Sequence, residues 1–239
     1  MKKYINNIKA ILFIGIVAFL FGFASKRNEL KKVSDIDVNF TNGDNLFITY
    51  EMVNKLLIQN YGELKSQPKE NIILRSLERT LKSNEMIEDA DVFLTIDGKL
   101  GASIKQRTPI ARVNDEAVAY YIDVKGDRMP LSANYSARVP LLSGVTANDI
   151  EDAYKLALLI YSDSFLQKQI IGIEQNSKKE FVLRTRIGNQ QIELGSLNNV
   201  KSKIEKLKAF YNKVLKDKTF NKYQIINLIY ANQVVCTKK

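Results

Sequence analysis

The feature that most constrains this chain is an uncharged apolar stretch at residues 10–24, AILFIGIVAFLFGFA. As an α-helix rising about 1.5 Å per residue it would be roughly 23 Å long, shorter than a hydrocarbon core of about 30 Å. Lys9 and Lys26 flank it, and their long stems can lie among the acyl chains while the ammonium groups reach the headgroups. The stretch therefore predicts one membrane-spanning helix.

A cleaved secretory signal is the alternative, because a basic start precedes the apolar run and Gly22 and Ala24 are spaced like a cleavage site. Phe23 and Lys26 make that site a poor one, so we favour an uncleaved anchor. In both cases we expect the residues after this stretch to lie on the far side of the membrane. The short N-terminal tail favours a cytoplasmic position for residue 1.

The charge distribution argues against nucleic-acid binding. The net charge is +10, but residues 33–195 hold 19 bases and 23 acids, whereas residues 196–239 hold ten bases and two acids. Such a C-terminal block is typical of a solvated helix face, although a Lys-rich amphipathic helix can also lie on an anionic membrane. We therefore expect a core helix over about 200–215 with a solvated face, which carries Lys201, Lys203, Lys206, Lys208 and Lys213.

The chain has no histidine, and its one cysteine is Cys236. Ser-His-Asp sites, Cys-His sites and histidine-ligated metals are therefore excluded, and no internal disulfide can form. A carboxylate pair or a Ser-Lys dyad has no recognisable motif, since the acidic cluster at residues 85–91 fits a turn between a helix and a strand. We expect no enzyme activity, no cofactor, no metal site and no small-molecule substrate.

Periodicity predicts a strand, two helices and a hairpin between residues 35 and 104. Apolar residues alternate over 36–40 and again over 92–104, where Asp97-Gly98 provides the turn. Helical spacing predicts one helix from Thr49 to a stop at Gly62 and another over 69–82. The apolar stripe of the second helix consists of Ile73, Leu74, Leu77 and Leu81. Two helices on one face of a three-stranded sheet form the arrangement of a POTRA module.

The second half of the chain predicts a mixed set of helices and strands. Asn148 can cap a helix that ends near residues 162–164. Strand patterns follow at 170–174, 180–187 and 190–194, with Gly188-Asn189 as a hairpin turn. We expect the helix over 200–215 to cover this sheet.

Four stretches resemble conserved segments of the bacterial FtsQ/DivIB division-protein family: MIEDADV, QRTPIARV, YYIDVKGDRMPL and VPLLSG. They occur in the family's order over residues 86–144. Asp97-Gly98 replaces the family's Trp-Pro pair, and Gln106 stands where Glu is usual. Pro109 and Gly126 have structural explanations, an edge-strand end and a positive φ respectively.

The resemblance implies an α+β chain with a single N-terminal transmembrane helix. It further implies a POTRA-like strand-helix-helix-strand-strand domain and then a mixed β domain with packed helices. The expected parts are a cytoplasmic tail (1–9), a transmembrane helix (10–25), a juxtamembrane linker (26–34), the POTRA-like domain (35–113) and the C-terminal β domain (114–239).

The resemblance also implies a non-enzymatic scaffold of septum formation in the bacterial cytoplasmic membrane, enriched at the division septum. Its partners would be FtsB-like and FtsL-like coiled-coil proteins and other divisome membrane proteins, and it would help to regulate septal peptidoglycan synthesis. One alternative is a POTRA-type component of assembly or secretion, and another is a membrane-anchored cell-wall hydrolase that uses two carboxylates.

The C-terminal segment is the predicted partner-binding site, since partner strands add to sheet edges and no charge or Pro occurs over 225–237. We expect one terminal strand over 226–235, with Tyr230 as its exposed anchor; an interior strand would equally explain its apolar residues. The site residues are Ile226, Asn227, Leu228, Ile229, Tyr230, Ala231, Asn232, Gln233 and Val234.

Overall fold

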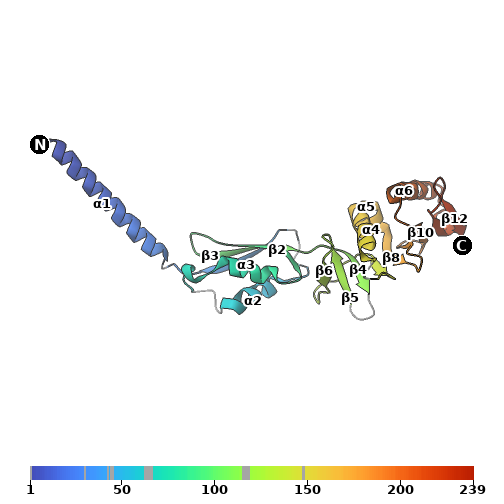
Figure 1. Ribbon diagram of the computed structural model, residues 1–239, viewed down its shortest axis with the longest axis horizontal. Coiled ribbons are helices and arrows are strands. Elements are labelled where there is room, and N and C mark those ends of the chain that lie inside the picture. Colours follow the sequence, from blue (N-terminus) through green and yellow to red (C-terminus); the bar gives the residue numbers. More distant parts are fainter. Residues whose placement is uncertain are drawn as a thin grey trace. The chain divides into compact units, whose positions relative to one another are not determined.

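The computed structural model describes residues 2–29, 31–41, 43, 46–61, 67–114, 119–146 and 149–239, and its fold is α+β as predicted (Figure 1). The chain divides into two compact units, Met1–Gln106 and Arg107–Lys239. The predicted helix stop at Gly62 and helix cap at Asn148 lie outside the described residues.

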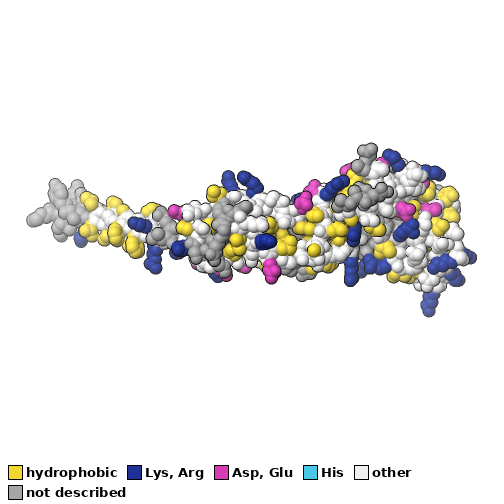
Figure 2. All heavy atoms as spheres, turned by 90° about the horizontal axis from the view of Figure 1, so that it is seen from below, with side chains coloured by type: hydrophobic (Ala, Val, Ile, Leu, Met, Phe, Trp, Pro, Cys, Tyr) yellow, Lys and Arg dark blue, Asp and Glu magenta, His cyan; other side chains and the backbone are white. Residues whose placement is uncertain are grey.

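Helix α1 (Lys2–Glu29) contains the apolar stretch. Its window Lys9–Arg27 has a mean hydropathy of 1.8 and is long and apolar enough to cross a membrane. Exposed large hydrophobic side chains occur at most positions from Ile11 to Phe23, and Figure 2 shows some of them in yellow on one face. None of this window is buried against the described part of the chain. A helix with an apolar surface on all sides suits lipid better than water.

The first unit has the predicted strand-helix-helix-strand-strand order. Its elements are β1 (Asp35–Phe40), α2 (Tyr50–Tyr61), α3 (Leu74–Lys82), β2 (Ile87–Leu94) and β3 (Lys99–Gln106). The sheet order is β1-β3-β2, with β1 parallel and β2 antiparallel to β3. Leu57 of α2 and Leu77 of α3 are fully buried in the same core as Leu100 and Ile104 of β3.

The second helix of this unit begins later than the sequence predicted. Lys69–Asn71 form a 3₁₀ turn, and Ile73 has extended dihedral angles (φ −90°, ψ 90°), so α3 starts only at Leu74. Ile72 therefore turns into the core, whereas Ile73 is 62% exposed. The prediction that Ile73 belongs to the buried stripe was wrong, because that stripe assumed one uninterrupted helix.

The second unit is built on a nine-stranded sheet with the order β12-β11-β10-β9-β8-β7-β4-β5-β6. Its strands are β4 (Pro109–Asn114), β5 (Ala119–Asp123), β6 (Arg128–Pro130), β7 (Leu141–Ser143), β8 (Ile170–Gln175), β9 (Phe181–Thr185), β10 (Gln191–Gly195), β11 (Tyr223–Asn227) and β12 (Val235–Lys238). Its α-helices are α4 (Ile150–Ser162), α5 (Ser164–Gln169) and α6 (Val200–Lys216). Buried residues of all three helices and of the central strands form one continuous core.

The division between the units differs from the predicted boundary at residue 113. Strand β4 pairs with β5 and β7 of the large sheet, and the contacts divide the chain between Gln106 and Arg107. Gln106 itself is buried, and its Oε1 accepts the backbone N–H groups of Phe47 and Ile48 at 2.9 and 3.0 Å. Gln106 thus holds the segment before α2 against the end of β3.

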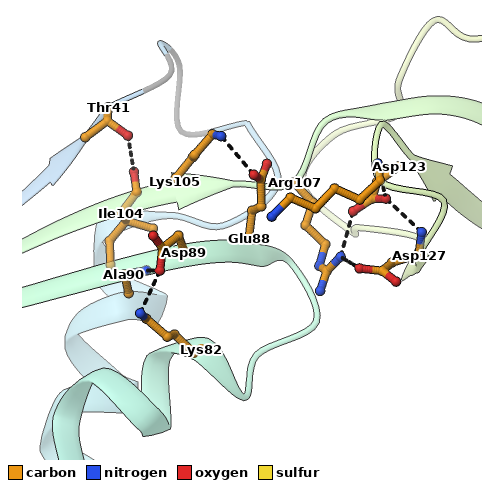
Figure 3. Close-up of polar contacts among 11 residues, drawn as sticks. Thr41, Lys82, Glu88, Asp89, Ala90, Ile104, Lys105, Arg107, Asp123 and Asp127 are labelled. Carbon is orange, nitrogen blue, oxygen red and sulfur yellow. Dashed lines mark hydrogen bonds and ion pairs between the residues drawn. The ribbon is translucent and has the colours of Figure 1, made fainter. Parts of the chain in front are cut away.

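A buried ion pair holds the turn after β5 (Figure 3). Arg107 Nη1 donates to Asp123 Oδ2 at 2.6 Å and to Asp127 Oδ2 at 2.8 Å, and both carboxylates raise the pKa of the guanidinium. Asp123 Oδ1 also accepts the N–H groups of Lys125 and Asp127, and Gly126 has the predicted positive φ, at 88°. Two of the family-like stretches, QRTPIARV and YYIDVKGDRMPL, are thus joined by this contact.

We expect Asp123→Asn to destabilise the second unit by about 1.5 to 3 kcal/mol, the range for hydrogen bonds to charged groups. The amide would place a donor or a neutral oxygen against Arg107, and the Asp123 side chain is only 2% exposed. Asp127→Asn is the matched control, because that side chain is 58% exposed and should cost under about 1 kcal/mol. Hydrogen exchange of the β5 amides measures both variants, and equal effects would contradict the assignment.

Candidate functional site

Strand β12 forms one edge of the large sheet. It pairs antiparallel with β11, with Asn227 opposite Val235, Ile226 opposite Cys236 and Ile225 opposite Thr237. On its other side β11 pairs parallel with β10. Within the described ranges no strand pairs with the outer side of β12. The edge of the sheet is therefore four residues long and runs from Val235 to Lys238.

The prediction of a single strand over residues 226–235 was wrong. Ile226 and Asn227 belong to β11, an interior strand, and residues 228–234 form a loop that leads into β12. Asn227 ends the strand because its Oδ1 accepts the backbone N–H of Ile229 at 2.9 Å, a local turn that competes with strand pairing. Its Nδ2 donates to Glu193 Oε2 on β10.

A lysine of α6 fixes the middle of this loop. Lys206 Nζ donates to the carbonyl oxygen atoms of Tyr230 at 2.6 Å and of Ala231 at 3.1 Å. Lys203 Nζ donates to the carbonyls of Leu194 and Ser196, and burial lowers the pKa of this ammonium group. The prediction that Lys203 belongs to a solvated face was wrong, since this side chain is buried and holds the end of β10. Lys206 is half-buried and holds the loop.

The nine predicted site residues consequently fall into two groups. Ile226 and Leu228 are fully buried in the core of the second unit, and Asn227 is half-buried. Ile229 is 47% and Tyr230 52% exposed. The next three residues of the loop are also exposed, and the last is half-buried: Ala231, Asn232 and Gln233, then Val234. The structure therefore places an exposed loop, rather than a strand, between β11 and the edge.

The edge strand itself alternates between the core and solvent. Val235 is 41% exposed and Thr237 is exposed, whereas Cys236 is half-buried and packs against the core. Burial raises the pKa of the Cys236 thiol, so this side chain stays neutral. Cys236, Thr237 and Lys238 were absent from the predicted site. Asn232, a turn-forming residue within the run Ala231-Asn232-Gln233, is the sequence signal that could have separated β12 from β11.

The main-chain donors of β12 point alternately inward and outward. Lys239 donates its backbone N–H to the carbonyl of Lys222, which fixes the inward direction at that residue. Successive N–H groups of a strand point to opposite sides, and the register irregularity of this pair lies on β11. The N–H groups of Cys236 and Lys238 therefore point away from the sheet and can bind the carbonyl groups of an added strand.

A buried polar network supports this edge from the core side. Gln190 Oε1 accepts the Tyr211 hydroxyl of α6 at 2.9 Å, and Gln190 Nε2 donates to the carbonyls of Phe220 and Tyr223. Burial raises the pKa of the Tyr211 phenol well above its ordinary value, so it remains a donor. The network ties the start of β11 to α6 and keeps the edge pair in place. In the described part of the chain, no group of three or more His, Cys, Asp or Glu side chains could hold a metal ion.

Two family models match this chain. The model described as FtsQ/DivIB, C-terminal related matches residues 108–237, more than half of the 239 residues, and a model described as a POTRA-like domain matches residues 32–105. The limits of both matches agree with the division of the structure after Gln106. No curated protein matches the chain.

Proposed function

This chain belongs to the family of FtsQ/DivIB C-terminal related proteins, and from that membership we propose that it binds divisome partners by accepting a partner strand at β12. The family is generally a non-enzymatic, division-associated scaffold with divisome protein partners. Together with α1, membership indicates a single-pass membrane protein. FtsB-like and FtsL-like proteins as the partners, and regulation of septal peptidoglycan synthesis, are parts of the proposal.

The observation that carries the proposal is the unpaired outer side of β12. Main-chain groups supply affinity in strand addition, while side chains at alternate positions supply selectivity. Lys238 is the one charged residue of this strand and lies at its end. Most exposed edges are protected by inward charges, Pro or bulges, and the preceding three residues carry none of these features.

Next to this edge, the exposed loop offers side chains that a partner could cover. Tyr230 is large, and its carbonyl is held by Lys206, so its backbone is already ordered before binding. Preorganised aromatic side chains lose little entropy on binding and are enriched among the residues that dominate interface energies. We therefore retain Tyr230 as the proposed anchor, on a loop beside the added strand.

The proposed topology has the N-terminus in the cytoplasm and both folded units outside it. Septal enrichment follows from the proposed partners, which would recruit the protein or be recruited by it. In the order of the chain, the POTRA-like unit lies between α1 and the second unit, and the proposed partner-binding strand β12 is the last element.

We expect Tyr230→Ala to weaken capture of FtsB-like and FtsL-like partners by about tenfold, which corresponds to about 1.4 kcal/mol. The change removes contact area from a side chain that is 52% exposed and outside the buried core. Co-purification of the full chain from membranes in mild detergent measures the effect. Tyr161→Ala on α4 is the control, because Tyr161 is also exposed, at 38%, and lies on another element. Normal capture by a folded Tyr230→Ala variant would contradict the anchor.

A further inference from the structure

The turn between β2 and β3 carries the most exposed large hydrophobic side chain among the described residues. Ile96 is 84% exposed, more than the 76% of Phe21 in α1. Exposed single hydrophobic residues are common on protein surfaces, so exposure alone assigns no role. The surroundings of this turn are what make it informative.

The turn lies at the end of the small sheet where the chain arrives from α1. Strands β1 and β3 are parallel and in register from their first residues, with Asp35 opposite Lys99. The turn that precedes β3 is therefore beside the segment that precedes β1. Ser34 confirms this position, since its backbone N–H donates to the Gly98 carbonyl at 2.9 Å.

The segment before β1 is part of the folded unit and not a free spacer. Val33 is 2% exposed, and its N–H donates to the Gln67 carbonyl at 3.0 Å. The carbonyl oxygen of Lys31 accepts a hydrogen bond from the backbone N–H of Lys69 at 3.2 Å. The predicted linker of residues 26–34 is thus fixed to the unit from Lys31 onward, which leaves little free chain after α1.

Two ammonium groups are held at the tip of the turn. Lys31 Nζ donates to the Ile96 carbonyl at 3.2 Å, and Lys69 Nζ donates to the same oxygen at 2.7 Å and to the Thr95 carbonyl at 2.9 Å. An ammonium group has three N–H donors, so within the described residues both lysines keep donor capacity for a further acceptor. Asp97 is the acid of the turn itself.

Chain length keeps this tip near the membrane. Arg27 ends the candidate span, and Lys31 follows four residues later. Four residues of extended chain span at most about 14 Å, whatever the angle between α1 and the sheet. Lys31 Nζ donates a hydrogen bond to the Ile96 carbonyl, so Ile96 lies within the length of one lysine side chain of Lys31. The distance from the end of the candidate span to Ile96 is therefore at most about 14 Å plus the length of that side chain.

We propose that this tip is a membrane contact. Ile96 inserts into the headgroup region of the bilayer that α1 spans, and Lys31 and Lys69 bind lipid phosphate groups beside it. An apolar side chain flanked by lysine ammonium groups is the chemistry by which proteins lie in the interface. One isoleucine binds lipid weakly, but the covalent tether to α1 makes the encounter intramolecular and raises the effective concentration to the millimolar range. The contact would fix the tilt of the first unit over the membrane.

The test uses the full chain in vesicles of phosphatidylcholine and phosphatidylglycerol, and the inference rests on α1 being an uncleaved anchor. A Cys236→Ser background carries Ile96→Cys labelled with an environment-sensitive fluorophore, and the control carries the label at Ile187→Cys instead. Ile187 is 53% exposed and belongs to the second unit. We expect the Ile96 label to be blue-shifted and quenched by nitroxide at the lipid headgroup, and the Ile187 label to resemble the dye in water.

The possible results distinguish a failure of this membrane contact from a failure of α1 as the anchor. A chain that fails to float with the vesicles would overturn the anchor and this inference together. A chain that floats while its Ile96 label stays in water would overturn the inference alone. A label that leaves water only when a partner protein is added would also overturn it, in favour of a protein contact. Unchanged quenching of the Ile96 label in a Lys31→Gln, Lys69→Gln variant would overturn the assignment of these two lysines to lipid phosphate groups.

Discussion

The Cys236→Pro variant should lose capture of FtsB-like and FtsL-like partners while keeping its fold. Proline removes the N–H that points away from the sheet and places its ring where an added strand would approach. The inward ladder between β11 and β12 is untouched, because Pro is tolerated in an edge strand at an outward-facing N–H. The lost hydrogen bond and the steric clash together should lower affinity by at least tenfold, or about 1.4 kcal/mol.

Cys236→Ala is the matched control, since it removes the same half-buried thiol and keeps the N–H. Co-purification from membranes with tagged partner measures both variants, and hydrogen exchange of the β11 amides reports whether the edge pair is intact. Capture that survives in a folded Cys236→Pro variant would remove strand addition at β12 as the mode of binding. Loss in both variants would point to the side chain instead.

The second large effect concerns the core of the first unit. Leu77→Ala should destabilise this unit by about 2 to 5 kcal/mol, because Leu77 is fully buried where α3 packs on β2 and the deletion leaves a cavity. Hydrogen exchange of the β2 and β3 amides in the full chain should then lose protection by a factor of about 30 or more.

Two controls accompany this measurement. Ile73→Ala changes a side chain that is 62% exposed, four positions before Leu77. It should therefore change the hydrogen-exchange protection of the β2 and β3 amides little. The amides of β8 and β9 belong to the second unit and report whether the variant acts locally. A loss with Ile73→Ala equal to that of Leu77→Ala would show that the face of α3 is misassigned.

Local patterns alone were sufficient for the apolar N-terminal helix and for most of the first unit. The uncharged run predicts α1 because lipid demands an apolar surface on every side of a helix. Alternation on both sides of Asp97-Gly98 predicts the β2-β3 hairpin, since strand period and turn chemistry are properties of neighbouring residues. Leu77 and Leu81 are fully buried, as their helical spacing predicts. In each case the deciding interactions lie within a few residues of sequence.

The candidate site needed the tertiary structure, because its decisive contacts join distant residues. Sequence favours one apolar strand over 226–235, but Asn227 bonds to Glu193, and Lys206 binds the carbonyls of Tyr230 and Ala231. These contacts bend the chain and move the open edge to β12. The same holds for β4, whose pairing with β7 assigns it to the second sheet. Periodicity states which side of a strand is apolar, but only long-range pairing decides which strand lies beside it and which edge stays open.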